Sequence, residues 1–476
     1  MISPFTNQET DRLNKLIEES KKGTTDFIRE YISKHNASKY QEGVDYYFKK
    51  NDIMKRNIYA YDAEGNKHID MDATNNKAAS GWHKLLVDQK VSYLTGEPVT
   101  LNSEDDDDAT DSINEVLGHK FNDMLPTLVK NASNKGVEWL HPYVDEQGNF
   151  DYIIIPAQEG IPIYENTKRN DLIGFIRKYK LDLDEEIEKV ELWDAETVTY
   201  YEYVNGQLYP DYSFGDEHVQ SHFYYKNDGY GWGSVPFVAF DNNDERVSDL
   251  TFTKDYIDIY DNLFADTANT LEDIQQILYE IRGYEGTSAS EALANIKRYK
   301  VVLVDGEKSG VDMKQGEMPM SSMDSYLDRL SKNLYTFGGG VDFDTDKFGN
   351  SPSGVALQFL FSNLDMRASV AERKFTRAIQ EFLWFVCEYL SIAENKEIDY
   401  KEITITFNKT IVSNQLEKVT MAQNSMGIVS KETLLENHPF VTDVEVEKQR
   451  LENEQGPYVT LDDEDEEDEQ ETTPSD

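Results

Sequence analysis

Residues 323–361 read MDSYLDRLSKNLYTFGGGVDFDTDKFGNSPSGVALQFLF, and the rest of the chain is arranged around this segment. Its first part predicts a helix, because apolar side chains recur every three or four residues as far as Phe337. The three glycines that follow end this helix, since glycine reaches a positive φ without a Cβ clash. An acidic segment, VDFDTDKFGN, comes next, and Ser353 then provides an N-cap for a second helix.

The second helix is predicted to run from Ser353 to about Asn395, without an internal proline. Its apolar residues follow helical spacing, and charges lie mostly between them. At 1.5 Å per residue this helix is roughly 60 Å long. The acidic segment is therefore a loop between two helices, either a plain surface connection or an insertion into a cavity. Local spacing alone favours the surface connection.

The composition limits the kinds of protein to consider. The chain has 476 residues, 47 basic and 91 acidic, and a net charge of −44. Its length predicts two to four domains. The charge argues against a general basic surface that grips nucleic acid, although an acidic wall can surround a polyanion without binding it. A single cysteine, Cys387, excludes an intrachain disulfide, and the absence of an 18-residue apolar run predicts a soluble, cytoplasmic chain.

Other patterns predict the remaining elements. Residues 139–240 contain short β-branched and aromatic runs, which predict one antiparallel meander with 236–240 as its last strand. Asn205-Gly206 predicts a type I′ hairpin turn within it. Residues 401–407 alternate as a strand. Helices are predicted at 7–34 (two), 75–93, 109–137, 255–278, 290–298, 413–424, 430–436 and 443–454, and a strand at 299–305.

The sequence lacks the common motifs of catalytic sites. The chain contains no P-loop, no HExxH, no paired cysteines and no GxSxG. His218 and His222 are four residues apart, but in a strand-and-loop region where they do not converge on a metal. We therefore expect no enzyme, no cofactor and no metal. An acidic hydrolase with a hidden carboxylate pair stays open as an alternative, and it requires a deep pocket with a carboxyl of raised pKa.

The order of five segments resembles the portal proteins of tailed bacteriophages, in the long-tailed branch that infects Gram-positive hosts. The resemblance covers about residues 25–455, and none of the segments is a catalytic signature. They are NNKAASGWHKLLVDQKVSYLTGEPV (75–99), IIIPAQEGIPIY (153–164), VPFVAFDNNDERVSDL (235–250), FGNSPSGVALQFLF (348–361) and GIVSKETLLENHPFVTDVEVEKQRL (427–451).

The resemblance implies an α+β portal fold with long stem helices, a strand-rich wing, a small αβ clip and a helical crown. The implied parts are N-terminal helices and wing (1–251), stem helix (252–278), clip (279–321), second stem helix (322–337), tunnel loop (338–352), long wing helix and strand (353–412), crown (413–455) and a disordered acidic tail (456–476).

The resemblance also implies a homo-oligomeric ring, usually of twelve subunits, at one vertex of the virion capsid. Double-stranded DNA passes through its channel during packaging and ejection, and assembly takes place in the host cytoplasm. The implied partners are the terminase large subunit, a head-completion adaptor, and the major capsid and scaffolding proteins, with no membrane. A structural capsid protein without a channel is the second alternative.

On this resemblance the loop becomes an insertion into the channel. The residues implied to face DNA are Gly338, Gly339, Gly340, Asp342, Asp344, Asp346, Lys347 and Asn350, with Lys332 as a channel lysine on the stem. The residues expected to dock partners at the clip are Tyr284, Glu285, Glu291, Lys297, Arg298 and Lys300.

Overall fold

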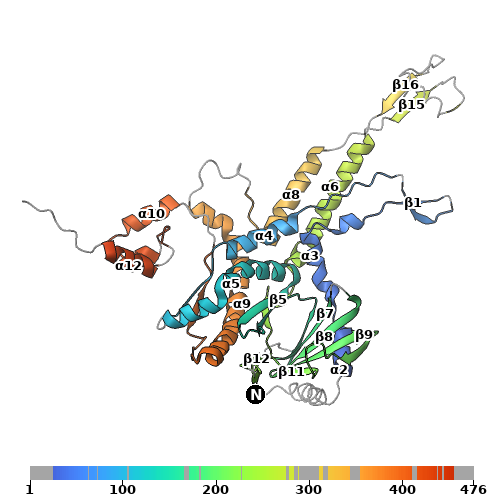
Figure 1. Ribbon diagram of the computed structural model, residues 1–476. Coiled ribbons are helices and arrows are strands. Elements are labelled where there is room, and N and C mark those ends of the chain that lie inside the picture. Colours follow the sequence, from blue (N-terminus) through green and yellow to red (C-terminus); the bar gives the residue numbers. More distant parts are fainter. Residues whose placement is uncertain are drawn as a thin grey trace, which may run out of the picture. The chain divides into compact units, whose positions relative to one another are not determined.

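The fold divides into two compact units, 1–343 with 360–410, and 344–359 with 411–476. The computed structural model describes residues 25–62, 64–71, 73–103, 107–165, 171–181, 184–226, 228–274, 278–282, 288, 310–314, 320–343, 354–409, 415–436, 438–441 and 444–454 (Figure 1). The expected helices before residue 25, the helix 290–298 and the strand 299–305 lie outside these residues.

The largest core of the first unit lies between a three-stranded sheet and two helices. The sheet has the order β14-β4-β5, and both pairs of strands are antiparallel. Phe382 of the helix α9 packs parallel to Phe121 of α5 and edge-on to Tyr152 of the sheet. The elements are β4 (Val137–Val144), β5 (Phe150–Ile155), β14 (Val238–Asp241), α5 (Asp107–Lys135) and α9 (Gly354–Glu394).

The helices α5 and α9 confirm their predicted spans to within a few residues. In α5, however, Gly118 interrupts the helical backbone with φ 58° and ψ −168°, so two helical pieces meet there. Glycine is suited to this position, because φ in this range strains a residue that carries a Cβ.

A second sheet has the order β10-β9-β8-β7-β6, with β11 paired to β9. The prediction of one meander across 139–240 was therefore wrong, since β4, β5 and β14 form a separate sheet. The hairpin at Asn205-Gly206 is confirmed, because both residues have positive φ, at 50° and 78°. The strands are β6 (Gly160–Tyr164), β7 (Leu172–Leu181), β8 (Asp184–Trp193), β9 (Thr197–Val204), β10 (Gln207–Pro210) and β11 (Val219–Ser221).

Four smaller strand pairs complete the described sheets. The predicted strand at 401–407 is confirmed as β17, which pairs antiparallel with β3. Residues predicted as the end of a helix, around Leu278, instead begin the strand β15, which pairs with β16. The pairs are β1 (Tyr59–Tyr61) with β2 (Lys67–Ile69), β3 (Thr100–Ser103) with β17 (Ile403–Thr406), β12 (Phe223–Tyr225) with β13 (Asp228–Tyr230), and β15 (Leu278–Arg282) with β16 (Gly310–Lys314).

The helices α6 and α8 run side by side (Figure 1). Tyr256 of α6 stacks on Phe337 of α8 with ring centroids 5.2 Å apart. Trp82 of α4 lies edge-on to Tyr260 and Tyr335, which joins all three helices. Their bounds are α4 (Trp82–Thr95), α6 (Lys254–Ile274) and α8 (Met320–Gly338).

The helix predicted at 75–93 begins only at Trp82, so its first seven residues were assigned wrongly. Acidic and amide side chains of α6 hold this segment outside a helix. The Asn76 amide donates to Asn269 Oδ1 at 2.7 Å, and the Ser80 amide donates to Asp261 Oδ1 at 2.9 Å. The remaining helices of this unit are α2 (Thr25–Lys34), α3 (Gln41–Tyr47), η1 (Ala37–Tyr40), η2 (Asp52–Lys55) and η3 (Asp249–Phe252).

Among its described residues, the second unit has three helices near the C-terminus, as the sequence predicted. They are α10 (Gln415–Asn424), α11 (Lys431–Glu436) and α12 (Val444–Glu454). An ion pair of 2.6 Å between Glu432 and Lys448 joins α11 to α12.

Three histidines make the stability of the first unit sensitive to acid: His83 and His141 are buried, and His222 is half-buried. Burial lowers the pKa of His83 to about 4, of His141 to about 3 and of His222 to about 4, from an ordinary value of 6.5. Between about pH 4 and 6.5 the unfolded chain therefore binds more protons than the folded one, and stability falls as the pH falls. We predict a loss of about 2 kcal/mol per histidine between pH 6.5 and 5 in urea unfolding. An NMR titration that gives these three histidines their ordinary pKa in the folded protein would contradict this assignment.

Candidate functional site

The end of α8, where the expected tunnel loop begins, is packed tightly against α4. Gly338 and Gly340 are buried, and Gly339 has φ 62°. The Gly340 amide donates to the Tyr335 carbonyl at 2.9 Å, which closes the helix. A Cβ on Gly338 would lie 2.5 Å from Leu86 Cδ1, and one on Gly340 would lie 2.4 Å from Leu86 Cδ2. These two glycines are therefore required by the close approach of α4 as well as by the helix end.

A side chain of α4 holds the first residue beyond the glycines. Gln89 Oε1 accepts from the Val341 amide at 2.9 Å, and Gln89 Nε2 donates to the Val341 carbonyl at 2.8 Å. This pair of hydrogen bonds satisfies both backbone groups of Val341, which is buried. The chain therefore leaves α8 in one direction, which α4 sets.

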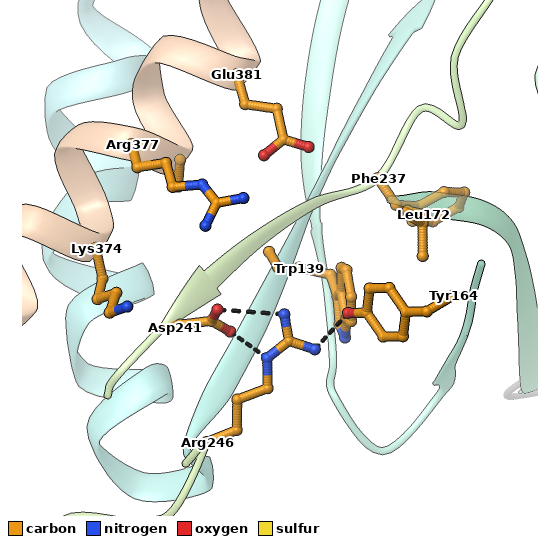
Figure 2. A pocket seen from close by; sticks show the side chains of 11 residues that line it. Trp139, Tyr164, Leu172, Phe237, Asp241, Arg246, Lys374, Arg377 and Glu381 are labelled. Carbon is orange, nitrogen blue, oxygen red and sulfur yellow. Dashed lines mark hydrogen bonds and ion pairs between the residues drawn. The ribbon is translucent and has the colours of Figure 1, made fainter. Parts of the chain in front are cut away.

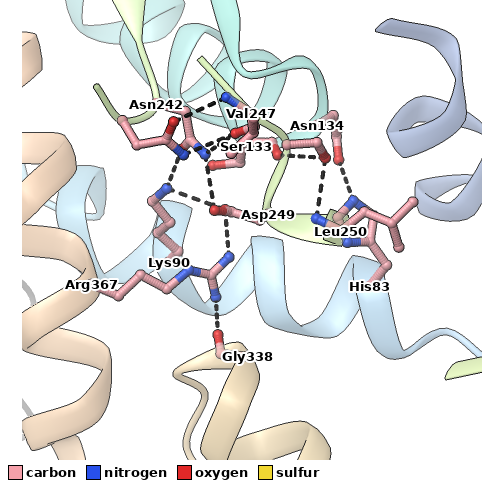
Figure 3. Close-up of polar contacts among 12 residues, drawn as sticks. His83, Lys90, Ser133, Asn134, Asn242, Val247, Asp249, Leu250, Gly338 and Arg367 are labelled. Atoms are coloured by element: carbon pink, nitrogen blue, oxygen red, sulfur yellow. Dashed lines mark hydrogen bonds and ion pairs between the residues drawn. The ribbon is translucent and has the colours of Figure 1, made fainter. Parts of the chain in front are cut away.

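Arg367 of α9 connects the end of α8 to the segment that precedes α6 (Figure 3). Its guanidinium donates to the Gly338 carbonyl and forms an ion pair with Asp249. A cation beside the last carbonyls of a helix is favourable, because those groups carry partial negative charge. Three elements that are distant in sequence therefore meet at one side chain.

Asp249 is also bound from the other side, by buried polar groups (Figure 3). Lys90 Nζ lies 3.2 Å from Asp249 Oδ2 and donates to Asn242 Oδ1 at 2.5 Å. Asn242 Nδ2 donates to Asp249 Oδ1 at 2.9 Å and to the Val247 carbonyl at 3.0 Å. We call Lys90, Asn242, Asp249 and Arg367, with the Gly338 carbonyl, the loop anchor.

The charges of the loop anchor compensate one another. Burial by itself would raise the pKa of Asp249, but the charges of Arg367 and Lys90 outweigh it and hold this pKa well below its ordinary value. Burial lowers the pKa of Lys90 to about 8, against the attraction of Asp249. Asp249 is therefore ionised at neutral pH, and removing one cation leaves a buried charge without its full compensation.

The structure describes only some of the predicted site residues. Gly338, Gly339 and Gly340 lie at the loop anchor, Asp342 follows it, and Lys332 is exposed on α8. Their contact with DNA stays a prediction. The other predicted positions lie outside the described residues: Asp344, Asp346, Lys347 and Asn350 of the loop, and Tyr284, Glu285, Glu291, Lys297, Arg298 and Lys300 of the clip.

Sequence reasoning missed the loop anchor itself. Two signals were present. Lys90 lies four residues from both Leu86 and Leu94, on the apolar stripe of its helix, and Arg367 lies three residues from Leu364 on the stripe of α9. A cation on a buried stripe requires a buried partner. The local sequence does not show which of the 91 acidic residues is that partner.

A second polar cluster lies around Asp241 (Figure 2). It is a candidate for the carboxyl of raised pKa that an acidic hydrolase would require. Burial raises the pKa of Asp241 in spite of Arg246, whose Nε lies 2.6 Å away. The cavity beside them measures about 70 Å³. A pocket for an organic substrate usually measures about 300–1,000 Å³. Arg246 also donates to Tyr164, so the cluster is a structural ion pair with room for a few water molecules.

Comparisons with known proteins identify the class to which this architecture belongs. Residues 27–458 match the family model described as phage portal protein, SPP1 Gp6-like. The chain is 39% identical over 469 residues to the portal protein of Bacillus phage SPP1, covering 97% of this chain and 93% of that protein. It is 32% identical over 433 residues to the portal protein of Clostridium phage phiCD119, covering 88% and 93%.

A solved chain from the neck of an empty GTA particle, computed with C6 symmetry, aligns with a TM-score of 0.43 and 12% identity, covering 74% of this chain and 88% of that one. The family match over most of the chain places it among the phage portal proteins. The chain belongs to the SPP1 Gp6-like family, with the α+β portal fold that the sequence predicted. Among the described residues, no helix is long and apolar enough to span a membrane.

The glycines of the loop anchor give a stability prediction. Gly340→Ala places a Cβ against Leu86 and Gln89 Oε1, so we expect a loss of about 1–3 kcal/mol in urea unfolding from overpacking. Gly81→Ala is the matched control, because nothing lies within 4 Å of its Cβ and its φ is −98°. Equal stability of the two variants would contradict the packing.

Arg367 gives a second prediction. Arg367→Gln leaves the Gly338 carbonyl and Asp249 without this cation, and we expect a loss of about 3 kcal/mol. Arg373→Gln on the same helix is the control, since Arg373 is exposed and we expect a change within about 0.5 kcal/mol. Hydrogen exchange at residues 338–343 should be faster in Arg367→Gln and unchanged in Arg373→Gln. Unchanged exchange there would exclude the anchor.

Proposed function

We propose that this portal protein assembles into a ring whose channel conducts double-stranded DNA into and out of the capsid. The observation that carries the proposal is the loop anchor, which holds the start of the loop between α8 and α9 at one defined position. A loop that guides a moving polymer requires a rigid base, and the portal family supplies the context.

Exposed apolar side chains beside the loop anchor support assembly from several copies. An open pocket of about 390 Å³ lies there. Phe252, Phe337 and Met366 line it, and they are 58%, 54% and 63% exposed in the single chain. Large apolar groups gathered at one site on a protein surface are typical of protein–protein contacts. A neighbouring subunit in a ring would cover them.

The polar faces of the two adjacent helices suggest which of them lines the channel. On α6, Asp261 is buried and binds Asn51, and Asp266 binds Arg56, so these acids serve contacts within the subunit. On α8, Asp328 and Lys332 lie one turn apart and both are exposed. We propose that this face of α8 contributes to the channel wall, where acidic groups keep DNA from binding tightly.

The remaining expectations from the family resemblance are part of the same proposal. The ring would have twelve subunits. It would dock the terminase large subunit and later a head-completion adaptor at the clip. At the capsid vertex it would contact the major capsid and scaffolding proteins. We propose that it has no catalytic activity. Membership of the phage portal family supports this part of the proposal.

Native mass spectrometry of the full chain tests assembly. We expect one closed oligomer of several copies. A monomer at all concentrations, including in infected-cell extracts, would overturn the proposal.

Lys332 gives a direct test of the channel face. Lys332→Gln removes an exposed charge, so we expect rings of unchanged mass and a changed salt dependence of DNA packaging with purified terminase, because phosphate contacts depend on salt. Lys180→Gln, an exposed lysine of β7, is the control. Identical salt profiles for Lys332→Gln, the control and the wild type would remove Lys332 from the channel.

A further inference from the structure

Exposed aromatic side chains gather at one edge of the six-stranded sheet. The edge strand there is β10, and the loop that follows it leads to β11. Three aromatic residues on this strand and loop are more than half exposed, Tyr209 at 54%, Tyr212 at 58% and Phe214 at 52%. A single exposed aromatic residue is common, but a group of them at one edge of a sheet indicates a surface that another segment covers.

These side chains extend around the edge from one face of the sheet to the other. Phe214 stacks on Tyr200 of β9, with ring centroids 4.5 Å apart. Tyr212 and Tyr201 both lie edge-on to His218, at 5.8 and 6.0 Å. Because neighbouring residues of a strand point to opposite faces, Tyr200 and Tyr201 belong to different faces. We call Tyr209, Tyr212, Phe214 and His218 the aromatic edge.

The helix α2 packs on one face of this sheet and begins at the same edge. Four residues into the helix, Arg29 donates to Gln207 Oε1 of the edge strand β10 at 2.9 Å. Just after its last residue, His35 Nε2 lies 3.0 Å from the Gln158 carbonyl oxygen, close to β6 at the other end of the sheet. The helix therefore crosses the sheet from β10 towards β6, and the chain before Thr25 enters it beside β10.

Residues 1–24 lie outside the described residues, and their sequence is complementary to the aromatic edge. Leu13, Leu16 and Ile17 have the three- and four-residue spacing of one apolar helix face. Residues 12–22, RLNKLIEESKK, hold four cations and two acids, in a chain whose net charge is −44. On the loop of the aromatic edge, Asp216 and Glu217 are exposed and form no ion pair with another described residue. Apolar pattern and charge therefore match on the two sides.

We propose that residues 12–22 form a helix that covers the aromatic edge of the same chain, with its apolar face on Tyr212 and Phe214. Such a helix is about 16 Å long, which is roughly the width of three neighbouring strands. Gly23 provides the turn that the chain needs before α2. An uncovered edge strand can pair with strands of other chains, and a helix over β10 blocks that pairing.

The occupant is a segment of the same chain because it starts beside the surface that it covers. A tethered segment has a high effective concentration at a nearby site, whereas a separate protein must bind from solution. A second copy has the same net charge of −44, so its surface as a whole is repelled by the acidic loop. The inference does not depend on the proposed ring.

Crosslinking in the full-length protein tests the proposal. Ser20→Cys and Asp216→Cys are combined in one chain, which is treated with a short bismaleimide; Ser20 lies four residues after Leu16, on the same helix face. The native Cys387 is buried, and burial raises the pKa of its thiol to about 12, so it does not react. We expect crosslinked peptides in the band of a single chain on a denaturing gel.

Met71→Cys in place of Asp216→Cys is the control, because Met71 is 88% exposed on another part of the chain. A crosslink yield no greater than that of this control would overturn the inference. Crosslinks that join only two separate chains would also overturn it, because a second copy would then cover the edge. Both results would leave the proposed ring unaffected.

Hydrogen exchange gives an independent readout. Leu13→Ser together with Leu16→Ser removes most of the apolar face, so we expect exchange at residues 211–218 to be about tenfold faster than in the wild type. Glu18→Gln, on the polar side of the same helix, is the control. Equal exchange in the double variant and the wild type would contradict a covered edge. Protection of residues 211–218 that arises only in assembled heads would show that another virion protein covers the edge, and would overturn the inference.

Discussion

The ion pair between Arg367 and Asp249, with the hydrogen bond from Arg367 to the Gly338 carbonyl, is the contact on which the architecture of the first unit depends. It joins α9 to the end of α8 and to the segment that leads into α6. Lys90 and Asn242 complete the group from α4 and from the end of the strand β14. Because these charges are buried, removing one of them leaves another without its counter-charge. The contacts among them therefore hold the start of the loop in one position.

The loop anchor fixes the position from which the loop starts. The glycines and Gln89 set the direction in which the chain leaves α8, and the amphipathic helix α9 returns it to the core against Phe121 and Tyr152. In the C-terminal helices, none of the described side chains is buried, and several large apolar groups are exposed.

Much of the fold was predictable where the pattern is local. The helix from Ser353 to Asn395 lacks proline and keeps one apolar stripe, and its observed bounds differ by one residue at each end. Asn205-Gly206 identified a hairpin because both residues accept positive φ. The errors arose from tertiary contacts. The backbone amides of Asn76 and Ser80 donate to side chains of α6, so this segment is not helical. A run of β-forming residues predicts a strand but does not show which sheet that strand joins. The loop anchor was missed for the same reason, since Lys90 meets Asp249 only after folding.

We propose that many copies of this chain close around an axis with the start of the loop facing inward. An electron cryo-microscopy map of purified full-length protein would reveal this arrangement. We expect a ring with an axial hole, the exposed face of α8 with Lys332 on the channel wall, and residues 341–343 at the innermost radius. A map that places Lys332 and Val341 on the outer perimeter, far from the symmetry axis, would contradict it.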